Sequence, residues 1–153
     1  MRRHVVLLLL PLAFCVVPAP AAAQQLGVGC DRERTTSIRF GRAGGELMPQ
    51  ATEITPQGVV RRRSNHEIGG TLGHVPADSV LALARDAWRG GFGGLPPAPR
   101  SDRPVTQPRP FIELHSACGM HHVEYDAGRE SPLFRALYAR LTRLTARAGR
   151  SRH

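Results

Sequence analysis

The fold of this chain is decided by residues 111–125, which read FIELHSACGMHHVEY. Two runs rich in apolar, aromatic and β-branched residues, Phe111–His115 and His121–Tyr125, stand on either side of Ser116–Met120. Short runs of this composition around a segment with glycine are typical of a β-hairpin. We therefore predict two antiparallel strands here, and the preceding sequence indicates further strands.

Three more strands are predicted upstream of the hairpin. Residues 36–40 alternate polar and apolar side chains, the period of a half-buried strand, and the glycines at 44–45 end that strand in a turn. Residues 51–55 and 59–63 flank Pro56-Gln57-Gly58, which predicts a second hairpin with a short loop.

Two helices are predicted from apolar spacing. The first opens at Pro76, which suits the first helical position, and ends at the glycines at 90–91. The second opens at Ser131-Pro132. The residues at helical spacing are Val80, Leu83, Ala84, Ala87 and Trp88, then Leu133, Phe134, Leu137, Leu141 and Leu144. Trp88 and Phe92 are expected to lie in the core.

The order of these elements is strand, hairpin, helix, hairpin, helix. Hairpin-length links and single helices favour an α+β domain. We predict a small antiparallel sheet of about five strands packed against two helices over residues 36–146. The six prolines of residues 96–110 predict an extended surface loop, and residues 147–153 form a basic tail.

Residues 1–23 have the three regions of a secretory signal peptide. A short basic head precedes an apolar run over residues 5–17, and small residues close the segment before Gln24. The apolar run is shorter than the roughly 20 residues of a transmembrane helix. We therefore expect a secreted or periplasmic protein without a transmembrane segment, which begins with an arm over residues 24–35.

Export would leave two cysteines, Cys30 and Cys118, because Cys15 lies within the predicted signal peptide. In an oxidising compartment such a pair favours one disulfide. That bridge would tie the arm to the hairpin. The alternatives are a free thiol and an intermolecular bridge.

The chain is basic, with a formal net charge of +9, and it contains no lysine. An all-arginine set in an Ala-, Gly- and Pro-rich chain points to coding bias more than to a surface selected for charge. Few aromatic residues are available to stack on bases. We expect a solvated basic face and no specific nucleic-acid partner.

The densest set of reactive side chains is His115, Cys118, His121 and His122. Imidazole and thiolate are the ligands that zinc and copper prefer. Adjacent His121 and His122 point to opposite faces of a strand, however, and a disulfide would remove the thiolate. We predict surface histidines on a disulfide-anchored hairpin, with no metal or other cofactor. A zinc or copper site on this hairpin is the alternative.

No assembled active site is visible in the sequence, and we expect no enzymatic activity. Residues 66–70 begin like a zincin motif but lack its second histidine. Glu113 and Glu124 lie on the two predicted hairpin strands and could form a carboxylate pair for acid–base chemistry. Arginine partners on neighbouring strands explain the two acids as well.

Three segments together resemble the emfourin family, whose namesakes are small α+β inhibitors of thermolysin-like metallopeptidases associated with protealysin. The segments are residues 38–45 (IRFGRAGG), residues 82–96 at the end of the first helix, and residues 131–141. The resemblance implies a small α+β fold and an inhibitor of a metallopeptidase, which would be an exported one because the signal peptide predicts export of this chain.

Blocking a peptidase cleft requires a rigid exposed segment, because preorganisation lowers the entropic cost of binding. We predict that the turn after the first strand supplies it, through the residues Phe40, Arg42, Gly44 and Gly45. The proline-rich loop is a second candidate. The expected function is non-enzymatic binding of another exported protein, which is a metallopeptidase if the resemblance holds.

Overall fold

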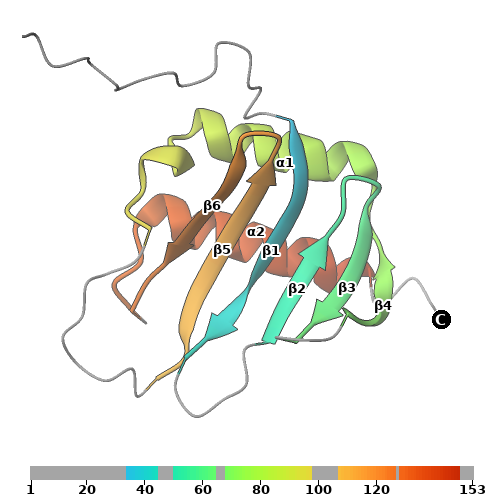
Figure 1. The fold of residues 1–153 in the computed structure, drawn as a ribbon, viewed down its shortest axis with the longest axis horizontal. Helices are drawn as coiled ribbons and strands as arrows, with labels where there is room; N and C mark the ends of the chain where they lie inside the picture. Colours follow the sequence, from blue (N-terminus) through green and yellow to red (C-terminus); the bar gives the residue numbers. More distant parts are fainter. Residues whose placement is uncertain (1–33, 45–49, 65–67, 98–106, 127, 149–153) are drawn as a thin grey trace, which may run out of the picture.

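A six-stranded sheet with two helices on one side is seen in the computed structural model, which describes residues 34–44, 50–64, 68–97, 107–126 and 128–148 (Figure 1). The elements are β1 (Thr35–Ala43), β2 (Gln50–Ile54), β3 (Val59–Arg63), β4 (Ile68–His74), α1 (Ala77–Arg89), the 3-10 helix η1 (Phe92–Gly94), β5 (Arg109–Ser116), β6 (Gly119–Glu124) and α2 (Pro132–Ala148). The predicted α+β class is confirmed. The predicted signal peptide, most of the arm and most of the proline-rich loop lie outside the described residues.

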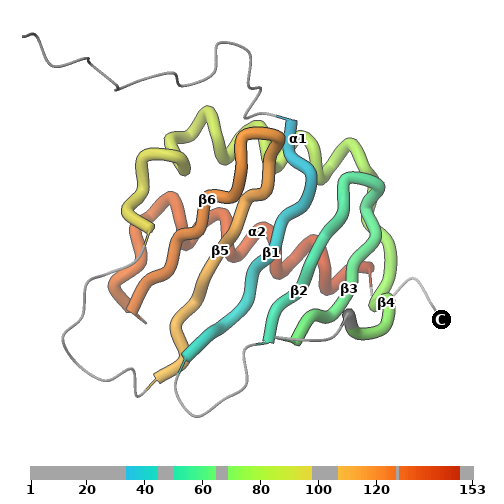
Figure 2. Tube along the Cα trace, viewed as in Figure 1, coloured from blue at the N-terminus to red at the C-terminus, as the bar shows by residue number. Residues whose placement is uncertain are grey.

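The strand order is β4-β3-β2-β1-β5-β6, and every neighbouring pair is antiparallel. The first four strands form a meander, whereas β5 and β6 lie on the other side of β1, as the tube in Figure 2 shows. β1 is therefore an interior strand that pairs with both β2 and β5. This order brings residues far apart in the sequence together on the sheet.

The apolar core lies between the sheet and the helices. Ile38 of β1 and Ile112 of β5 pair across the sheet and are both fully buried. The helices contribute Val80, Leu83, Ala84 and Ala87 from α1, and Phe134, Leu137, Leu141 and Ala148 from α2. Phe92 is fully buried and Trp88 packs against the same core, so their predicted role is confirmed. Burying one large apolar side chain stabilises a fold by about 1.5 to 3 kcal/mol.

The other side of the sheet carries no helix among the described residues, since α1 and α2 lie on the same side in Figure 1. Side chains alternate between the two faces of a strand. Because Ile38, Ile54 and Ile112 point to the helices, Arg39 of β1 and Glu113 of β5 point away from them. This uncovered surface is called the open face below.

β4 is a strand that the sequence pattern did not predict, so the sheet has six strands and not about five. Gly69, Gly70 and Gly73 give its sequence a low β propensity. Packing requires one of these glycines, because a Cβ on Gly73 would collide with the carbonyl oxygen of Ala148 in α2. Glycine thus lets the end of α2 approach β4 closely.

β5 begins at Arg109, inside the segment of residues 96–110 that was predicted to be a loop, and it contains Pro110. The Pro110 carbonyl accepts a hydrogen bond from the Tyr125 N–H, on the β6 side. The N–H and C=O of one strand residue point the same way, so the N–H that proline lacks would also face the end of β6. The ladder to β1 therefore loses no hydrogen bond.

α2 opens as predicted and extends further than predicted. The Ser131 Oγ accepts a hydrogen bond from the Phe134 N–H at 3.1 Å, which caps the helix. The helix continues to Ala148, past the predicted domain end at residue 146. Within the described ranges, no helix has the length and apolar character needed to cross a membrane.

Candidate functional site

A row of charged side chains crosses the open face. The strand register places Arg61 of β3, Glu53 of β2, Arg39 of β1, Glu113 of β5 and His122 of β6 side by side. Basic and acidic side chains alternate along this row, so each acid has a basic neighbour on either strand. Opposite charges at directly paired positions stabilise a sheet by about 0.2 to 1 kcal/mol per pair.

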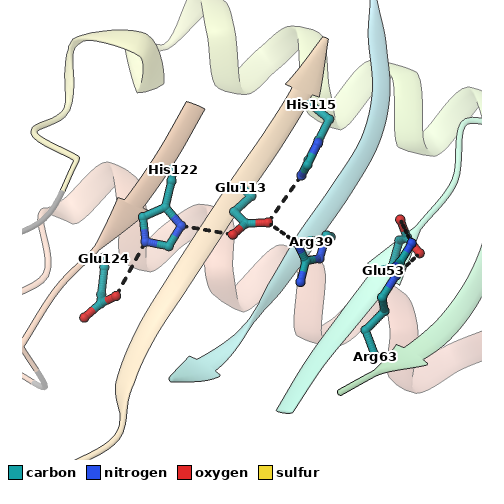
Figure 3. Close-up of polar contacts among 7 residues, drawn as sticks. All are labelled: Arg39, Glu53, Arg63, Glu113, His115, His122 and Glu124. Atoms are coloured by element: carbon teal, nitrogen blue, oxygen red, sulfur yellow. Dashed lines mark hydrogen bonds and ion pairs between the residues drawn. The ribbon is translucent and has the colours of Figure 1, made fainter. Parts of the chain in front are cut away.

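Glu113 is the centre of the row, and three basic groups converge on it (Figure 3). Its Oε2 lies 2.8 Å from Arg39 Nη1 and 3.2 Å from His115 Nε2, and its Oε1 lies 3.1 Å from His122 Nδ1. Glu113 is only 8% exposed. A carboxylate so buried needs charged or hydrogen-bonding partners, and neighbours on β1, β5 and β6 provide them.

His122 lies between two carboxylates. Figure 3 shows its Nδ1 directed at Glu113 and its Nε2 directed at Glu124. The distance from Nε2 to Glu124 Oε2 is 3.5 Å. The imidazole stacks on Phe111 with a centroid distance of 5.7 Å and an interplanar angle of 20°. Arg109 Nη1 lies 3.4 Å from the other oxygen of Glu124. Both ring nitrogens can donate only when the ring is protonated, so this environment favours the imidazolium.

The contacts shift two pKa values in opposite directions. Burial alone would raise the pKa of Glu113, but hydrogen bonds from His122 and His115 and the charge of Arg39 outweigh it, and the pKa lies below its ordinary value of 4.5. The hydrogen bond to Glu113 raises the pKa of His122 above its ordinary value of 6.5, against a smaller effect of burial, and Glu124 adds to the rise. The His122 ring therefore stays charged to a higher pH than ordinary histidine.

This network is suited to holding strands together rather than to proton transfer. A protonated His122 with each nitrogen directed at a carboxylate has no lone pair to accept a proton from a substrate. The predicted carboxylate pair is also separated, because Glu124 pairs with Phe111 while Glu113 pairs with His122. The alternative explanation for the two acids, arginine partners on neighbouring strands, fits the contacts of Glu113 with Arg39 and of Glu124 with Arg109.

A shallow hollow lies beside the charged row. The next row along the strands consists of Arg63, Ala51, Gly41 and Phe111, so its two central positions carry a methyl group or no side chain. Arg63 is fixed at one wall, where its Nε lies 2.8 Å from Oε2 of Glu53. Phe111 forms the opposite wall. The open face thus combines a paired charge network with a small gap.

The four predicted partner-binding residues do not share one surface. Phe40 is 5% exposed and packs edge-on against Tyr138 of α2, because it points to the helix side of β1. Its predicted role as a contact residue is therefore wrong. Arg42 is exposed, and Gly44 stands at the end of β1 with a φ of 84°. Gly45 lies outside the described residues.

The set of metal ligands considered from the sequence does not converge. His121 points to the helix side of β6, where its Nε2 lies 3.1 Å from the Phe92 carbonyl oxygen. His115 and His122 lie on the open face and share Glu113. In the described part of the chain, no group of three or more His, Cys, Asp and Glu side chains is placed to hold a metal ion.

Cys118 lies in the turn between β5 and β6, and its backbone N–H donates a hydrogen bond to Ser116 Oγ at 3.2 Å. Cys30, its predicted disulfide partner, lies outside the described residues. The Cys30–Cys118 bridge therefore stays a prediction.

Sequence reasoning missed the roles of Arg39 and Arg63, and with them the hollow. Alternation within residues 36–40 is enough to place Arg39 on a polar face. Its partner depends on which residue of β5 lies opposite, and neither strand alone encodes that register. The contact between Glu53 and Arg63 had a local signal, since both lie on the predicted hairpin around residues 56–58.

Comparison with protein-family models, with curated proteins and with solved structures found no match for this chain. The functional proposal accordingly depends on the residues and geometry of the chain itself, together with the resemblance of its sequence segments.

Proposed function

We propose that this chain is an exported, non-enzymatic binding protein that inhibits a thermolysin-like metallopeptidase. The observation that carries the proposal is the open face with the end of β1 at its edge. It is a sheet surface without a helix layer among the described residues, and its charged groups are engaged with one another rather than arranged around a reacting atom.

The end of β1, which leads into the predicted contact turn, is held from several sides. Arg42 pairs with Gln50 of β2 and with Pro110 of β5, so β1 is flanked on both edges as far as Arg42, and Ala43 still pairs with Arg109 of β5. The Tyr138 hydroxyl of α2 donates a hydrogen bond to the Gly41 carbonyl at 3.2 Å. A segment that is already ordered loses little conformational entropy on binding, which favours affinity and resists cleavage.

The choice of a peptidase as partner is supported by the resemblance to emfourins. Residues 38–45 include most of β1, residues 82–96 include the end of α1 with η1, and residues 131–141 include the start of α2. The first segment contains Arg42 and Gly44 at the end of β1, where alternation directs the Arg42 side chain to the side of Phe40 and the Ala43 side chain to the open face. The zinc- or copper-binding alternative has less support, because His121 and His122 point to opposite sides of the sheet.

The test is inhibition of a panel of thermolysin-like metallopeptidases by the mature protein, measured as initial rates of peptide hydrolysis. We expect saturable loss of activity while the chain stays intact. Added zinc should not restore activity, which separates inhibition by contact from removal of the peptidase's metal. Full peptidase activity at large molar excess, or digestion of the chain, would overturn the proposal.

A matched pair of variants locates the contact. Arg42→Ala should weaken inhibition about tenfold, the effect of losing about 1.4 kcal/mol of binding free energy at one interface residue. Arg143→Ala removes another exposed arginine, from α2 instead of β1, and should leave inhibition unchanged. Equal effects of the two changes would argue against the turn as the contact.

A further inference from the structure

The hollow on the open face is built into the sequence of two strands. Gly41 and Ala51 pair on β1 and β2, with Arg63 beyond Ala51 and Phe111 beyond Gly41. A Cβ on Gly41 would collide with the carbonyl oxygen of Gln50, so no larger side chain fits at that position without a backbone shift. The gap therefore does not depend on how a long side chain happens to be oriented.

The size of the hollow suits one side chain. Its volume is about 160 Å³, whereas pockets for small-molecule ligands and cofactors have about 300 to 1,000 Å³. Phe111 and Ala51, which are 4% and 5% exposed, give it apolar walls. Such a space accepts a short methylene stem better than an organic cofactor.

Two arginines, Arg39 and Arg63, line the same hollow. Arg39 uses Nη1 for Glu113, but its Nε is buried and has no hydrogen-bond partner among the described residues. A buried donor without a partner costs about 1 to 3 kcal/mol, which an acceptor on a ligand would offset. Arg63 lines the other side, with 35% of its side chain exposed.

The charge at the rim favours an anion. Arg39, Arg63 and His122 line the hollow, and the hydrogen bond to Glu113 raises the pKa of His122. Among the described residues that line the hollow, the one carboxylate is Glu113, whose oxygens already face Arg39, His115 and His122; Glu53, beside the hollow, pairs with Arg63. A ligand carboxylate would therefore meet arginine donors more readily than an uncompensated negative charge.

We propose that the hollow receives one acidic side chain, a glutamate or aspartate, from the protein partner. Its methylene stem lies against Phe111 and Ala51, and its carboxylate lies between Arg39 and Arg63. The inference rests on the proposed function, because it takes the ligand from a protein. Ala43 lines the hollow and precedes Gly44, so one partner can occupy the hollow and contact the end of β1 together.

The test is an NMR titration of the ¹⁵N-labelled mature protein with a capped glutamate, N-acetyl-L-glutamate N-methylamide. We expect saturable shifts of the Arg39 Nε–H signal and of amides around Ala51, with a dissociation constant in the millimolar range. The matched neutral probe, the capped glutamine, should cause no such shifts. Equal responses to the two probes, or no response to the capped glutamate, would overturn the inference.

Two variants place the binding at the hollow. Ala51→Leu fills it without changing any charge, and Arg63→Gln removes one cation while keeping N–H donors. Each should weaken the response to capped glutamate at least fivefold, whereas Arg143→Gln on α2 should not. The second variant keeps the test informative if Ala51→Leu fails to fold. Unchanged binding by folded Ala51→Leu and Arg63→Gln would refute the site.

The inference and the proposed function can fail separately. A chain that binds capped glutamate but inhibits no peptidase keeps the hollow as a carboxylate site and overturns the peptidase proposal. A chain that inhibits with the same potency after Ala51→Leu, and ignores capped glutamate, keeps the peptidase proposal and overturns the hollow.

Discussion

Glu113 joins three strands through one carboxylate. Its partners are Arg39 on β1, His115 on its own strand β5 and His122 on β6. β1 and β5 are neighbours that the chain connects only through β2, β3, β4 and α1, so this contact closes a long loop. The side chain therefore helps to fix the register on which the whole open face depends.

Replacing Glu113 by Gln should lower the free energy of unfolding by about 2 kcal/mol, since hydrogen bonds to charged groups contribute about 1.5 to 3 kcal/mol. Glu53→Gln is the matched control, because Glu53 is equally buried at 8% and, within the described part of the chain, its one ion pair is with Arg63. It should lower the same free energy by about 1 kcal/mol or less. Urea unfolding followed by circular dichroism measures both, and equal losses would contradict the central role of Glu113.

The pH dependence of stability follows from the same pair. The raised pKa of His122 makes its stabilisation complete below about pH 6.5, and it is lost as the pH rises through the folded-state value. The lowered pKa of Glu113 makes its stabilisation complete above about pH 4.5, and it is lost as the pH falls through the folded-state value. The contact between His122 and Glu113 therefore stabilises the fold most between about pH 4.5 and about pH 6.5.

The variant His122→Gln isolates that contribution. The difference in unfolding free energy between the wild type and this variant should be largest near about pH 5.5 and should shrink towards both pH 9 and pH 3. Urea unfolding at a series of pH values gives the difference directly. A difference that grows between pH 6 and pH 9 would show that His122 does not act as a cation.

For single residues, the sequence predicted the face to which a side chain points better than it predicted the residue that the side chain contacts. Alternation correctly separated His121 from His122, because the two-residue period of a strand is a local property. The same alternation should have placed Phe40 with Ile38 on the buried side, and the prediction of Phe40 as a contact residue overlooked this. The partners of Arg39 required the register between β1 and β5, which tertiary packing sets.

Among the strands, β4 packs through glycine, whereas the other strands pack through alternating apolar side chains. Gly73 lies against the end of α2, while Gly70 on the same strand has open space around the position of a Cβ. Strands are recognised in a sequence by the alternation of their apolar and polar side chains. A strand with three glycines lacks that alternation and is therefore not predicted. The two helices and five other strands had the periodicity that β4 lacks.

Alanine substitutions in β4 test this explanation. Gly73→Ala should lower the free energy of unfolding by about 1 to 3 kcal/mol, the range for a group forced into a packed contact. Gly70→Ala should be neutral or slightly stabilising, because alanine reduces the entropy of the unfolded chain and meets nothing in the fold. Thermal unfolding compares the two, and similar midpoints would mean that α2 does not press on Gly73.

At the scale of the whole molecule, the predicted Cys30–Cys118 disulfide concerns the attachment of the arm to the sheet. Cys118 lies in the β5–β6 turn, at the end of the strand that carries Glu113. A bridge that closes a loop of about 90 residues would stabilise the fold by about 4 to 5 kcal/mol in the chain-entropy model. The bridge would add to the stability that the apolar core provides and would leave the contacts of the open face unchanged.

Thiol titration of the unfolded, unreduced mature protein should find no free thiol. Cys30→Ser should then expose one thiol and lower the free energy of unfolding by about 4 kcal/mol. Reduced wild-type protein is the control and should match the variant. Two titratable thiols in protein recovered from the exported fraction would rule out the bridge.

The claim that this chain binds a peptidase through its turn and open face is tested most directly by calorimetric titration of the mature protein into an intact thermolysin-like metallopeptidase. Run near pH 7.5 in two buffers of different ionisation enthalpy, the titration should show one-to-one binding with proton uptake. An acidic side chain beside His122 stabilises its charged form, so this uptake should decrease in His122→Gln. The absence of binding to every peptidase in the panel would contradict the claim.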